Sequence, residues 1–544
     1  MQNGPWLEAP RLFHVEWFIF HLHGQSRYNR VIVHSLALTG QTLSIEDFYD
    51  VALHRHPVRL APSAIRRMVR AHGVIRRAAA GAKPVYGVTT GFGKLADQRI
   101  PQSDIEQLQV NLVRSHAAGV GEPLTTEETR GLMLLRANVL ARGHSGVRPS
   151  LVSDLLQLLN RRVHPVIPCR GSVGACGDLA PLAHLALVLI GEGEAMIGSR
   201  RVSGRAALTH AGLKPIRLDA KEGLSLVNGT QAMLALGLLA LRRATILIDT
   251  ADVAGALTLE ALKGTPVAFD ARIHRLRPYP GQMTVAANLR ALLAKSEIRV
   301  SHMDCSRVQD AYSLRCMPQV HGAVRDALDY IRRTLLIELN SVTDNPLVFP
   351  DRNEVLSGGN FHGQPLGLVL DHMAIAITEL ASIAERRIER LTNPEYGDLP
   401  PFLSPDPGLN SGFMLAQVTA AALTSENKVL SHPASVDSIP TSGNREDHVS
   451  MGMGSALKLK QVLTNAEYVL AIELMCAAQG VEFHRPLKPG VGSRLACRGL
   501  RRVVPRLEQD RVMGPDIERV RSLVADGLFM KVLSTCRPPS RRTS

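Results

Sequence analysis

Three glycine-rich segments in the first half of the chain carry the residues best suited to chemistry. They are Tyr86-Gly-Val-Thr-Thr-Gly-Phe-Gly93, Ala117–Gly121 and Gly171-Ser-Val-Gly-Ala-Cys-Gly-Asp178. Glycine at this density lets the backbone turn sharply and approach a bound group closely. Loops of this kind carry function more often than the helices between them. Cys176, in the third segment, is a candidate nucleophile, but the sequence identifies no histidine base for it.

Other familiar catalytic motifs are incomplete or absent. Val88-Thr-Thr-Gly-Phe-Gly-Lys94 approaches a phosphate-binding loop, but valine stands at its first glycine position and Leu95 replaces the magnesium-binding serine or threonine. Gly143-His-Ser145-Gly lacks the second spacing glycine of a nucleophile elbow. The sequence has no His-Glu-x-x-His motif and no Cys/His cluster at zinc spacing. We therefore expect no metal site.

The segment from Gly171 to His184 resembles the aromatic amino acid ammonia-lyase family, in which an Ala-Ser-Gly triplet cyclises into 4-methylidene-imidazol-5-one (MIO). Here the triplet is Ala175-Cys176-Gly177, so its middle residue departs from the usual serine. The resemblance extends from about residue 40 to about residue 530. It implies an autocatalytic MIO group and no external cofactor.

The chemistry of ammonia elimination explains why such a ring is needed. The reaction removes a weakly acidic β-proton and a poor leaving group, so the protein must bind or make an electrophile. Attack of the Gly177 amide nitrogen on the Ala175 carbonyl would close a ring, and only small residues permit so tight a turn. A thiol has a pKa of about 8.5, so thiolate leaves more readily than hydroxide. We expect Cys176 to lose hydrogen sulfide and the ring to form; the alternative is a silent relative in which Cys176 stays a buried thiol.

The resemblance also assigns catalytic roles at some distance from the triplet. Tyr86 matches the tyrosine proposed to take the β-proton, a role that needs its pKa lowered from about 10. Asn228 matches the asparagine beside the ring, whose amide can donate to an oxyanion. Gln309, Tyr312 and Arg315 match a second cluster, in which Arg315 is the bidentate partner for the substrate carboxylate.

A third stretch, Ser357-Gly-Gly-Asn-Phe-His362, carries Phe361, which matches a residue lining the family's active site. Asn360 and His362 fit either the site or structural hydrogen bonds. The chain departs from the family pattern at Cys176, Met317, Gly363-Gln364 and Arg445. These departures leave room for a shifted substrate, such as a modified histidine, or for weak activity.

Two positions bear on the choice of substrate. His116 matches a residue near the substrate ring in members that handle either imidazole or phenol side chains. Glu446 is more selective, because relatives that act on phenylalanine or tyrosine typically have glutamine there. A carboxylate accepts an imidazole N–H and is left desolvated and unpaired against a phenyl ring. The alternative is that Glu446 pairs with Arg445 at the surface.

Long helices are predicted to position these loops. Apolar residues repeat every three or four positions from Val324 to Leu339, from Leu366 to Leu391, and over roughly Ala456–Leu474. Asn345-Pro346 and Asn393-Pro394 follow the first two runs as stop signals. Helices this long usually pack side by side. The predicted fold is mainly α, with an elongated central helical bundle like that of the MIO lyases and a loop-rich N-terminal catalytic domain.

We predict four regions along the chain. An atypical N-terminal extension occupies residues 1–38, where both tryptophans lie. The MIO-bearing domain covers residues 39–225 and the long-helix domain residues 226–535. A disordered basic tail, residues 536–544, completes the chain.

Composition excludes several other classes of protein. Hydrophobic residues make up 45% and charged residues 21%, as in globular proteins. The net charge is +14, but the basic residues are scattered along the chain and no base-reading motif accompanies them. This favours a solvated surface over nucleic-acid binding. Seven cysteines, an odd number without a Cys-x-x-Cys pair, favour a reducing compartment. Arg242 and Arg243 interrupt the most apolar stretch, Met233–Leu247, so we expect a cytoplasmic protein without a membrane span.

Taken with Glu446, the resemblance predicts a lyase that converts L-histidine to trans-urocanate and ammonia. It implies a homotetramer whose active sites are shared between subunits. The alternatives are a tyrosine or phenylalanine ammonia-lyase, an aminomutase built on the same ring, and a catalytically silent relative.

Overall fold

A computed structural model describes residues 35–304 and 308–537. A compact unit begins at Ser35. The extension predicted for residues 1–38 therefore lies outside the described residues except for its last four positions, as does the basic tail beyond Arg537. The other boundaries predicted between domains stay predictions.

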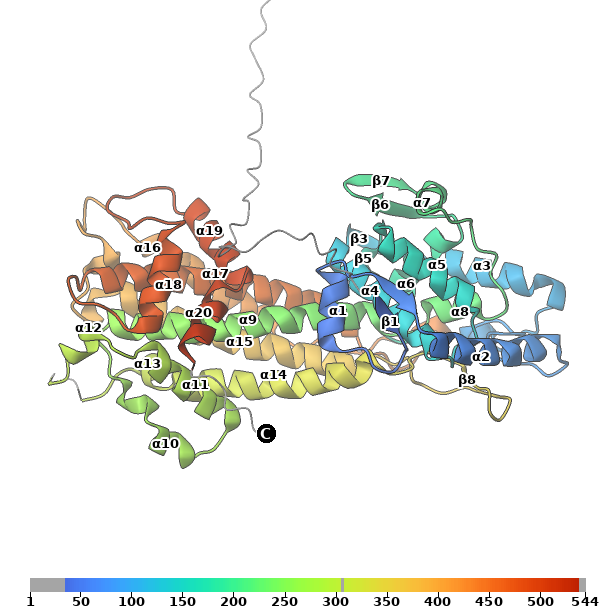
Figure 1. Ribbon diagram of the computed structural model, residues 1–544, viewed down its shortest axis with the longest axis horizontal. Coiled ribbons are helices and arrows are strands. Elements are labelled where there is room, and N and C mark those ends of the chain that lie inside the picture. The colour runs from blue at the N-terminus through green and yellow to red at the C-terminus, as the bar shows by residue number, and fades with distance from the viewer. Residues whose placement is uncertain (1–34, 305–307, 538–544) are drawn as a thin grey trace, which may run out of the picture. The chain divides into compact units, whose positions relative to one another are not determined.

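The first part of the unit consists of short helices separated by loops (Figure 1). These helices are α1 (Ile45–Ala52), α2 (Pro62–Ala80), α3 (Ile105–His116), α4 (Thr126–Ala141), α5 (Pro149–Asn160), α6 (Leu179–Leu189), α7 (Gly204–Ala211) and α8 (Glu222–Val227). Capping boxes at Ser44 and Thr125 start α1 and α4 by satisfying backbone N–H groups that the first helical turn leaves free.

Strands in the described ranges are short and serve mainly to tie loops together. They are β1 (Leu36–Leu38), β2 (Val58–Leu60), β3 (Val120–Pro123), β4 (Val163–Pro165), β5 (Pro168–Arg170), β6 (Glu194–Ile197), β7 (Arg200–Ser203), β8 (Leu347–Phe349) and β9 (Glu354–Leu356). β1 pairs with β2 in parallel, and antiparallel pairing joins β3 to β5, β4 to β6, β6 to β7 and β8 to β9. The β3–β5 pair brings the second and third glycine-rich segments together.

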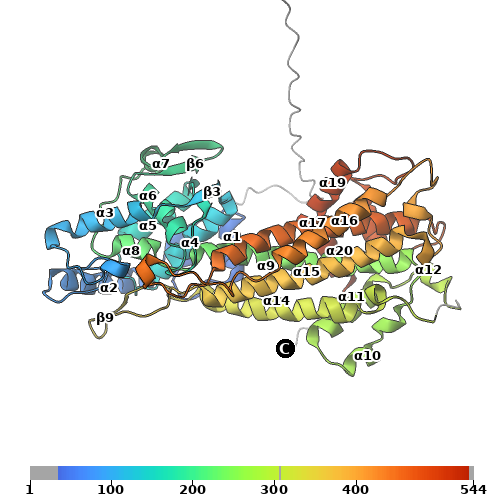
Figure 2. The ribbon, with the colours of Figure 1, turned by 180° about the vertical axis from the view of Figure 1, so that it is seen from behind.

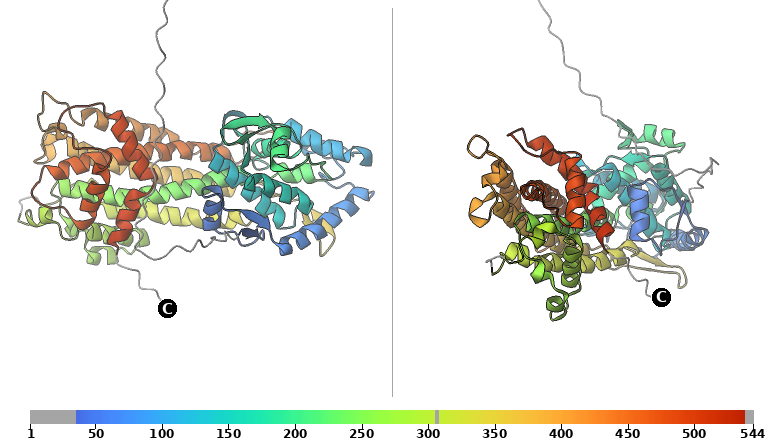
Figure 3. Two further views of the ribbon diagram at one scale, coloured as in Figure 1. Left: turned by 45° about the horizontal axis from the view of Figure 1, so that its top comes forward. Right: turned by 60° about the vertical axis from the view of Figure 1, so that its left-hand side comes forward.

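Long helices dominate the rest of the unit and run side by side (Figures 1 and 2). They are α9 (Gln231–Ala261), α14 (Met317–Leu339), α15 (Gln364–Thr392), α16 (Met414–Leu430) and α17 (Gly452–Glu482). They remain parallel to one another when the unit is turned (Figure 3). The predicted mainly helical fold with a central bundle is therefore confirmed.

The predicted apolar stripes form the contacts between these helices. Every stripe residue of α14 and α15 is buried, from Val324 to Leu339 and from Leu366 to Leu391. α15 ends just before Asn393-Pro394, as predicted. α14 ends at Leu339, the last residue of its apolar stripe and six residues before Asn345 of the proline signal.

Two of these helices, α9 and α15, are long and apolar enough to cross a membrane by length and composition alone. The most apolar windows are 78% and 61% buried within the described part of the unit. A core helix of a soluble protein passes the same test. The arginines of α9 therefore do not distinguish it from a membrane span, contrary to expectation; burial among its neighbours does.

Shorter helices cover one end of the bundle, opposite the end that carries α3, α6 and α8 (Figure 1). They are α10 (Ala271–Arg275), α11 (Pro280–Leu292), α12 (Glu297–Val300), α13 (Tyr312–Arg315), α18 (Val491–Arg501), α19 (Gly514–Ala525) and α20 (Leu528–Cys536). The connection between α16 and α17 returns to the N-terminal helices, where its orange ribbon lies beside α2 and α8 (Figure 2). This return brings residues 440–450 to the glycine-rich loops.

Candidate active site

The Ala175-Cys176-Gly177 triplet lies in the loop between β5 and α6. Gly174 and Gly177 adopt φ values of 68° and 70°, in the left-handed region that favours glycine. A Cβ on Gly177 would lie 2.1 Å from the carbonyl oxygen of Gly229, so only glycine fits at this position. Ala175 is buried as well. The tight, glycine-dependent turn and the small residues fit the geometry that ring closure requires.

Asp178 fixes the C-terminal side of the triplet. Its carboxylate accepts hydrogen bonds from the backbone N–H groups of Ala232 and Met233, both at 2.9 Å, at the start of α9. It also accepts from the Ser172 hydroxyl at 3.1 Å. Burial raises the pKa of Asp178 to about 6, against the effect of these three donors. The helix start and the loop are thereby held together through one buried side chain.

Ser450, just before α17, fixes the N-terminal side. Its hydroxyl donates to the Gly174 carbonyl at 3.0 Å and accepts from the Gly452 N–H at 3.2 Å. The Gly363 N–H also donates to the Gly174 carbonyl, at 3.2 Å. The triplet is thus braced by segments far away in the sequence.

A cavity of about 320 Å³ opens beside the triplet. Six of the predicted site residues line it: Tyr86, His116, Cys176, Asn228, Phe361 and Glu446. They come from five separate segments and from the loop that holds the triplet. The sequence-based prediction placed these residues in one site, and in this structure they share one cavity.

Cys176 and Glu446 contact each other directly. The Cys176 Sγ donates to Glu446 Oε1 at 3.0 Å, and the Thr441 hydroxyl donates to Oε2 at 2.7 Å. Burial and then the Glu446 carboxylate raise the pKa of the Cys176 thiol far above its ordinary value. Burial acts against ionisation of the carboxyl group, but hydrogen bonds from Cys176 and Thr441 hold the Glu446 pKa below its usual range. The pair therefore consists of a neutral thiol and an ionised carboxylate.

The surface pairing considered for Glu446 does not occur. Arg445 instead forms an exposed ion pair with Asp97 at 3.6 Å. Thr441 and Glu446 form an isolated antiparallel β-bridge, in which the Thr441 N–H donates to the Glu446 carbonyl at 2.9 Å. This bridge turns the Glu446 carboxylate inward. Thr441 was not predicted as a site residue. Its hydroxyl-bearing side chain five residues before Glu446 is a weak signal, because only this turn brings the two together.

Tyr86 lies at the edge of the cavity with its ring against Phe92, at a centroid distance of 6.4 Å. Its hydroxyl accepts a hydrogen bond from the Gly93 N–H at 3.3 Å. Buried Val88, packed among apolar residues of α2, anchors the same loop. Burial raises the pKa of Tyr86, the Gly93 N–H offsets this in part, and Cys176 and Glu446 raise it further. This differs from the lowered pKa that a tyrosine base needs, because burial of the phenol has the largest influence on that pKa.

Asn228 is buried at the C-terminal end of α8. Its Nδ2 donates to the Asn345 carbonyl at 3.1 Å and to Asp344 Oδ1 at 3.4 Å, and its Oδ1 has no hydrogen-bond partner. Lys221 holds Asp344 in place through a fully buried ion pair of 2.8 Å. The free atom of this amide is therefore an acceptor, whereas the predicted role uses a donor.

His116 ends α3 and faces Glu446 across the cavity. Burial lowers its pKa, and the Leu112 carbonyl and the Glu446 charge offset this in part. Its Nδ1 lies 3.0 Å from the Ser115 hydroxyl. A neutral imidazole and a carboxylate thus line the side of the cavity where the substrate ring is expected.

Gln309, Tyr312 and Arg315 do not line this cavity. They belong to or precede α13, at the opposite end of the bundle (Figure 1). Tyr312 is 71% exposed, and the Arg315 guanidinium stacks on its ring at 4.6 Å. The Arg315 Nε has no hydrogen-bond partner. One chain therefore brings the first group of predicted residues together and leaves the second group apart.

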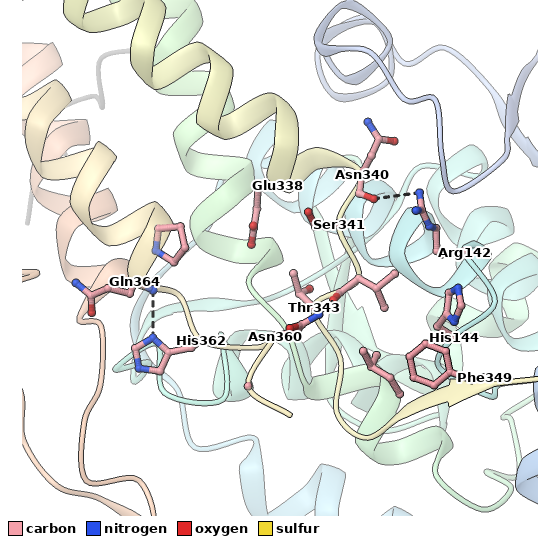
Figure 4. A pocket seen from close by; sticks show the side chains of 14 residues that line it. Arg142, His144, Glu338, Asn340, Ser341, Thr343, Phe349, Asn360, His362 and Gln364 are labelled. Carbon is pink, nitrogen blue, oxygen red and sulfur yellow. Dashed lines mark hydrogen bonds between the residues drawn. The ribbon is translucent and has the colours of Figure 1, made fainter. Parts of the chain in front are cut away.

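Asn360 and His362 flank Phe361 but line a different cavity of about 760 Å³, between the end of α14 and the start of α15 (Figure 4). Asn360 donates to the Val342 carbonyl at 3.2 Å, and His362 Nε2 lies 3.1 Å from the His448 carbonyl. Both side chains thus hold loops in place around the segment that carries Phe361. Across residues 35–304 and 308–537, no group of three metal-binding side chains is positioned to hold an ion.

Comparisons with known proteins find related sequences over most of the chain. The profile of the family described as aromatic amino acid lyases matches residues 43–502. A histidine ammonia-lyase of Koribacter versatilis is 55% identical over 506 residues, which cover 91% of this chain and 98% of the relative.

Two solved structures share the fold. The crystal structure of histidine ammonia-lyase from Trypanosoma cruzi is 44% identical, with a TM-score of 0.86 and coverage of 93% of this chain and 96% of that one. A tyrosine aminomutase from Streptomyces globisporus is 40% identical, with a TM-score of 0.88 and coverage of 94% and 100%. A family profile that spans most of the chain, and relatives matched over nearly their full length, establish that this chain belongs to the aromatic amino acid lyase family.

Proposed function

We propose that this chain is a carbon–nitrogen lyase that converts L-histidine to trans-urocanate and ammonia, the first step of histidine degradation. One observation carries the choice of substrate: the Glu446 carboxylate is ionised, half-buried and turned into the cavity beside Cys176. An imidazole N–H satisfies such an oxygen, whereas a phenyl ring leaves it desolvated without a partner. The similarity to histidine ammonia-lyases over nearly the whole chain supports the same choice.

The proposed cofactor is MIO, formed from Ala175, Cys176 and Gly177 with no external group. Once formed, it supplies an electrophile for the substrate's amine. Tyr86, at the cavity edge, takes the β-proton. His116 and Glu446 hold the imidazole, and Phe361 closes the wall around it.

The remaining groups complete the site from outside this cavity. Arg315 binds the substrate carboxylate through two parallel hydrogen bonds, and Gln309 and Tyr312 act beside it. Because these residues lie at the far end of the bundle in their own chain, we propose that another copy supplies them within a homotetramer. The protein acts in the cytoplasm on a small amino acid, without nucleic acid or membrane.

The second candidate is an aminomutase or ammonia-lyase that acts on tyrosine or phenylalanine. The similarity to the Streptomyces globisporus tyrosine aminomutase favours it. Glu446 opposes it, since a phenyl ring places no hydrogen-bond donor beside the carboxylate, and relatives that act on phenylalanine or tyrosine typically have glutamine at this position.

Ultraviolet detection of urocanate from purified protein and L-histidine tests the proposal, with Cys176→Ala as the control. Product that disappears in the control supports both the reaction and the cysteine-derived electrophile. A folded tetramer that makes no urocanate contradicts the histidine assignment, and the intact mass then separates another substrate from a silent relative.

A further inference from the structure

The contact between Cys176 and Glu446 bears on how the electrophile is made, a step that precedes the proposed reaction. The sulfur that must leave lies 3.0 Å from an ionised carboxylate oxygen. Thr441 holds the other oxygen at 2.7 Å, so the carboxylate cannot turn away without losing that bond. A negative charge is therefore fixed against the leaving group.

Maturation proceeds by two losses. The Gly177 nitrogen bonds to the Ala175 carbonyl carbon, and one water leaves with that carbonyl oxygen and the amide protons of Cys176 and Gly177. A base then takes the Cα proton of Cys176, its electron pair forms the Cα=Cβ bond, and the Cβ–Sγ bond breaks. The sulfur departs with the electron pair of the broken Cβ–Sγ bond as hydrosulfide, which combines with a proton to give hydrogen sulfide.

Glu446 has two opposite effects on the second loss. It helps to keep the thiol protonated, which favours hydrosulfide over the much poorer sulfide dianion. Burial, however, is the larger cause of the raised thiol pKa and already keeps the sulfur protonated near neutral pH. The other effect is repulsion, because negative charge grows on the sulfur beside a fixed carboxylate. A like charge at this separation in a half-buried site should slow the loss of the sulfur by about tenfold or more.

Other charged or titratable groups at the cavity do not cancel this repulsion. Burial lowers the pKa of His116, so its imidazole is neutral near neutral pH. Tyr86 is held neutral by its raised pKa. Lys94 lines the cavity but is exposed to solvent, which screens its charge.

We propose that Glu446, the carboxylate that selects the imidazole substrate, slows formation of the electrophile from Cys176. The inference rests on the MIO ring of the proposed function. It means that substrate selection and maturation place opposite requirements on the Glu446 side chain: the carboxylate favours binding of the imidazole but slows formation of the ring. Loss of the sulfur also removes the hydrogen-bond donor from Oε1. The mature site therefore presents an unpaired carboxylate oxygen where an imidazole N–H can bind.

The test follows maturation from the newly made chain. The wild-type chain, Glu446→Gln and Glu446→Ala are synthesised in a cell-free reaction near neutral pH, and intact mass is read over time for the loss of one water and one hydrogen sulfide. Released sulfide is measured in parallel. Asp97→Asn is the matched control, because it removes one carboxylate charge from the same region at a surface position where the Asp97 side chain is 86% exposed and pairs with Arg445.

We expect both Glu446 variants to mature about tenfold faster than the wild-type chain, and Asp97→Asn to mature at the wild-type rate. Damage to a merely structural residue slows folding and ring closure, so acceleration is a result that a structural role does not give. Equal or slower maturation in both Glu446 variants overturns the inference. If no folded chain loses hydrogen sulfide, both this inference and the proposed MIO ring are wrong. If the wild-type chain matures but makes no urocanate, only the proposed reaction is wrong.

Discussion

The cavity at Cys176 and the short helix α13 carry two groups of predicted catalytic residues, but they differ in burial, exposure to solvent and hydrogen bonding. The cavity draws six predicted residues from separate segments of one chain, and buried polar contacts brace its walls. The α13 region instead presents Tyr312 to solvent and leaves the Arg315 Nε without a hydrogen-bond partner. The cavity encloses these six residues, but Arg315, the predicted partner of the substrate carboxylate, does not line it.

This difference indicates which parts of the site one chain can organise alone. The triplet loop depends on close backbone packing, such as Gly177 against Gly229, and that packing forms within a single chain. Under the proposed function, the Arg315 cluster meets a cavity of this kind when another copy of the chain approaches it. A symmetric oligomer supplies such a surface from an identical copy.

The largest effect is expected from removing the sulfur. Cys176→Ala cannot form the methylidene, so urocanate production should fall by about a thousandfold or more, and the intact mass should show no loss of hydrogen sulfide. Cys536→Ala, which alters a free cysteine of α20, is the control. Activity that survives in Cys176→Ala would show that the cavity works without a ring.

A second experiment asks whether the two regions act in different copies. Arg315→Ala should lose about a hundredfold in kcat/KM, because it removes a charge-assisted bidentate contact. Arg390→Ala is the matched control, since Arg390 also stacks on a tyrosine, Tyr396, at 4.4 Å.

Co-expression of Cys176→Ala with Arg315→Ala then separates sharing from its absence. If sites combine residues of two copies, random mixing restores about a quarter of the sites. Recovery near zero, in mixed tetramers verified by mass, would mean that each chain supplies both regions to the same site.

Substrate choice depends on the cavity side of the comparison. Glu446→Gln should lower kcat/KM for histidine by about a hundredfold and improve the relative rate with phenylalanine or tyrosine, because the carboxylate no longer demands an N–H donor. Parallel assays with the three amino acids measure this ratio. An unchanged ratio would place the selection at another residue.

The smallest effect concerns the pH profile of Tyr86. A tyrosine base works deprotonated, so activity rises with pH through its pKa, and the environment within one chain raises that pKa. If another copy brings cations to the site, the rising limb of kcat/KM in the wild-type enzyme should lie below the ordinary value of about 10. It should move upward by about one unit in Arg315→Gln, and a limb that does not move would exclude Arg315 as the cause.

Sequence patterns alone predicted the long helices. Burial of one helix face spaces the apolar residues three or four positions apart, and no other type of secondary structure has this spacing. The stripes of α14 and α15 are buried as predicted. Motif resemblance predicted the six cavity residues, since each lies in a short sequence motif that can be recognised without knowing the rest of the fold. The last apolar residue of the first stripe, Leu339, is also the last residue of α14, and the proline signal lies six residues further along the chain.

Tertiary structure alone decided which groups face one another. Glu446 follows Arg445 directly, and only the turn to Thr441 sends the carboxylate inward to Cys176 while Arg445 pairs with Asp97 outside. The direction of the Tyr86 pKa is likewise a property of its surroundings, because burial and neighbouring charges act through space. Residue types determine which chemistry is available to this chain, and the distances between them, which the sequence does not contain, determine which of it is used.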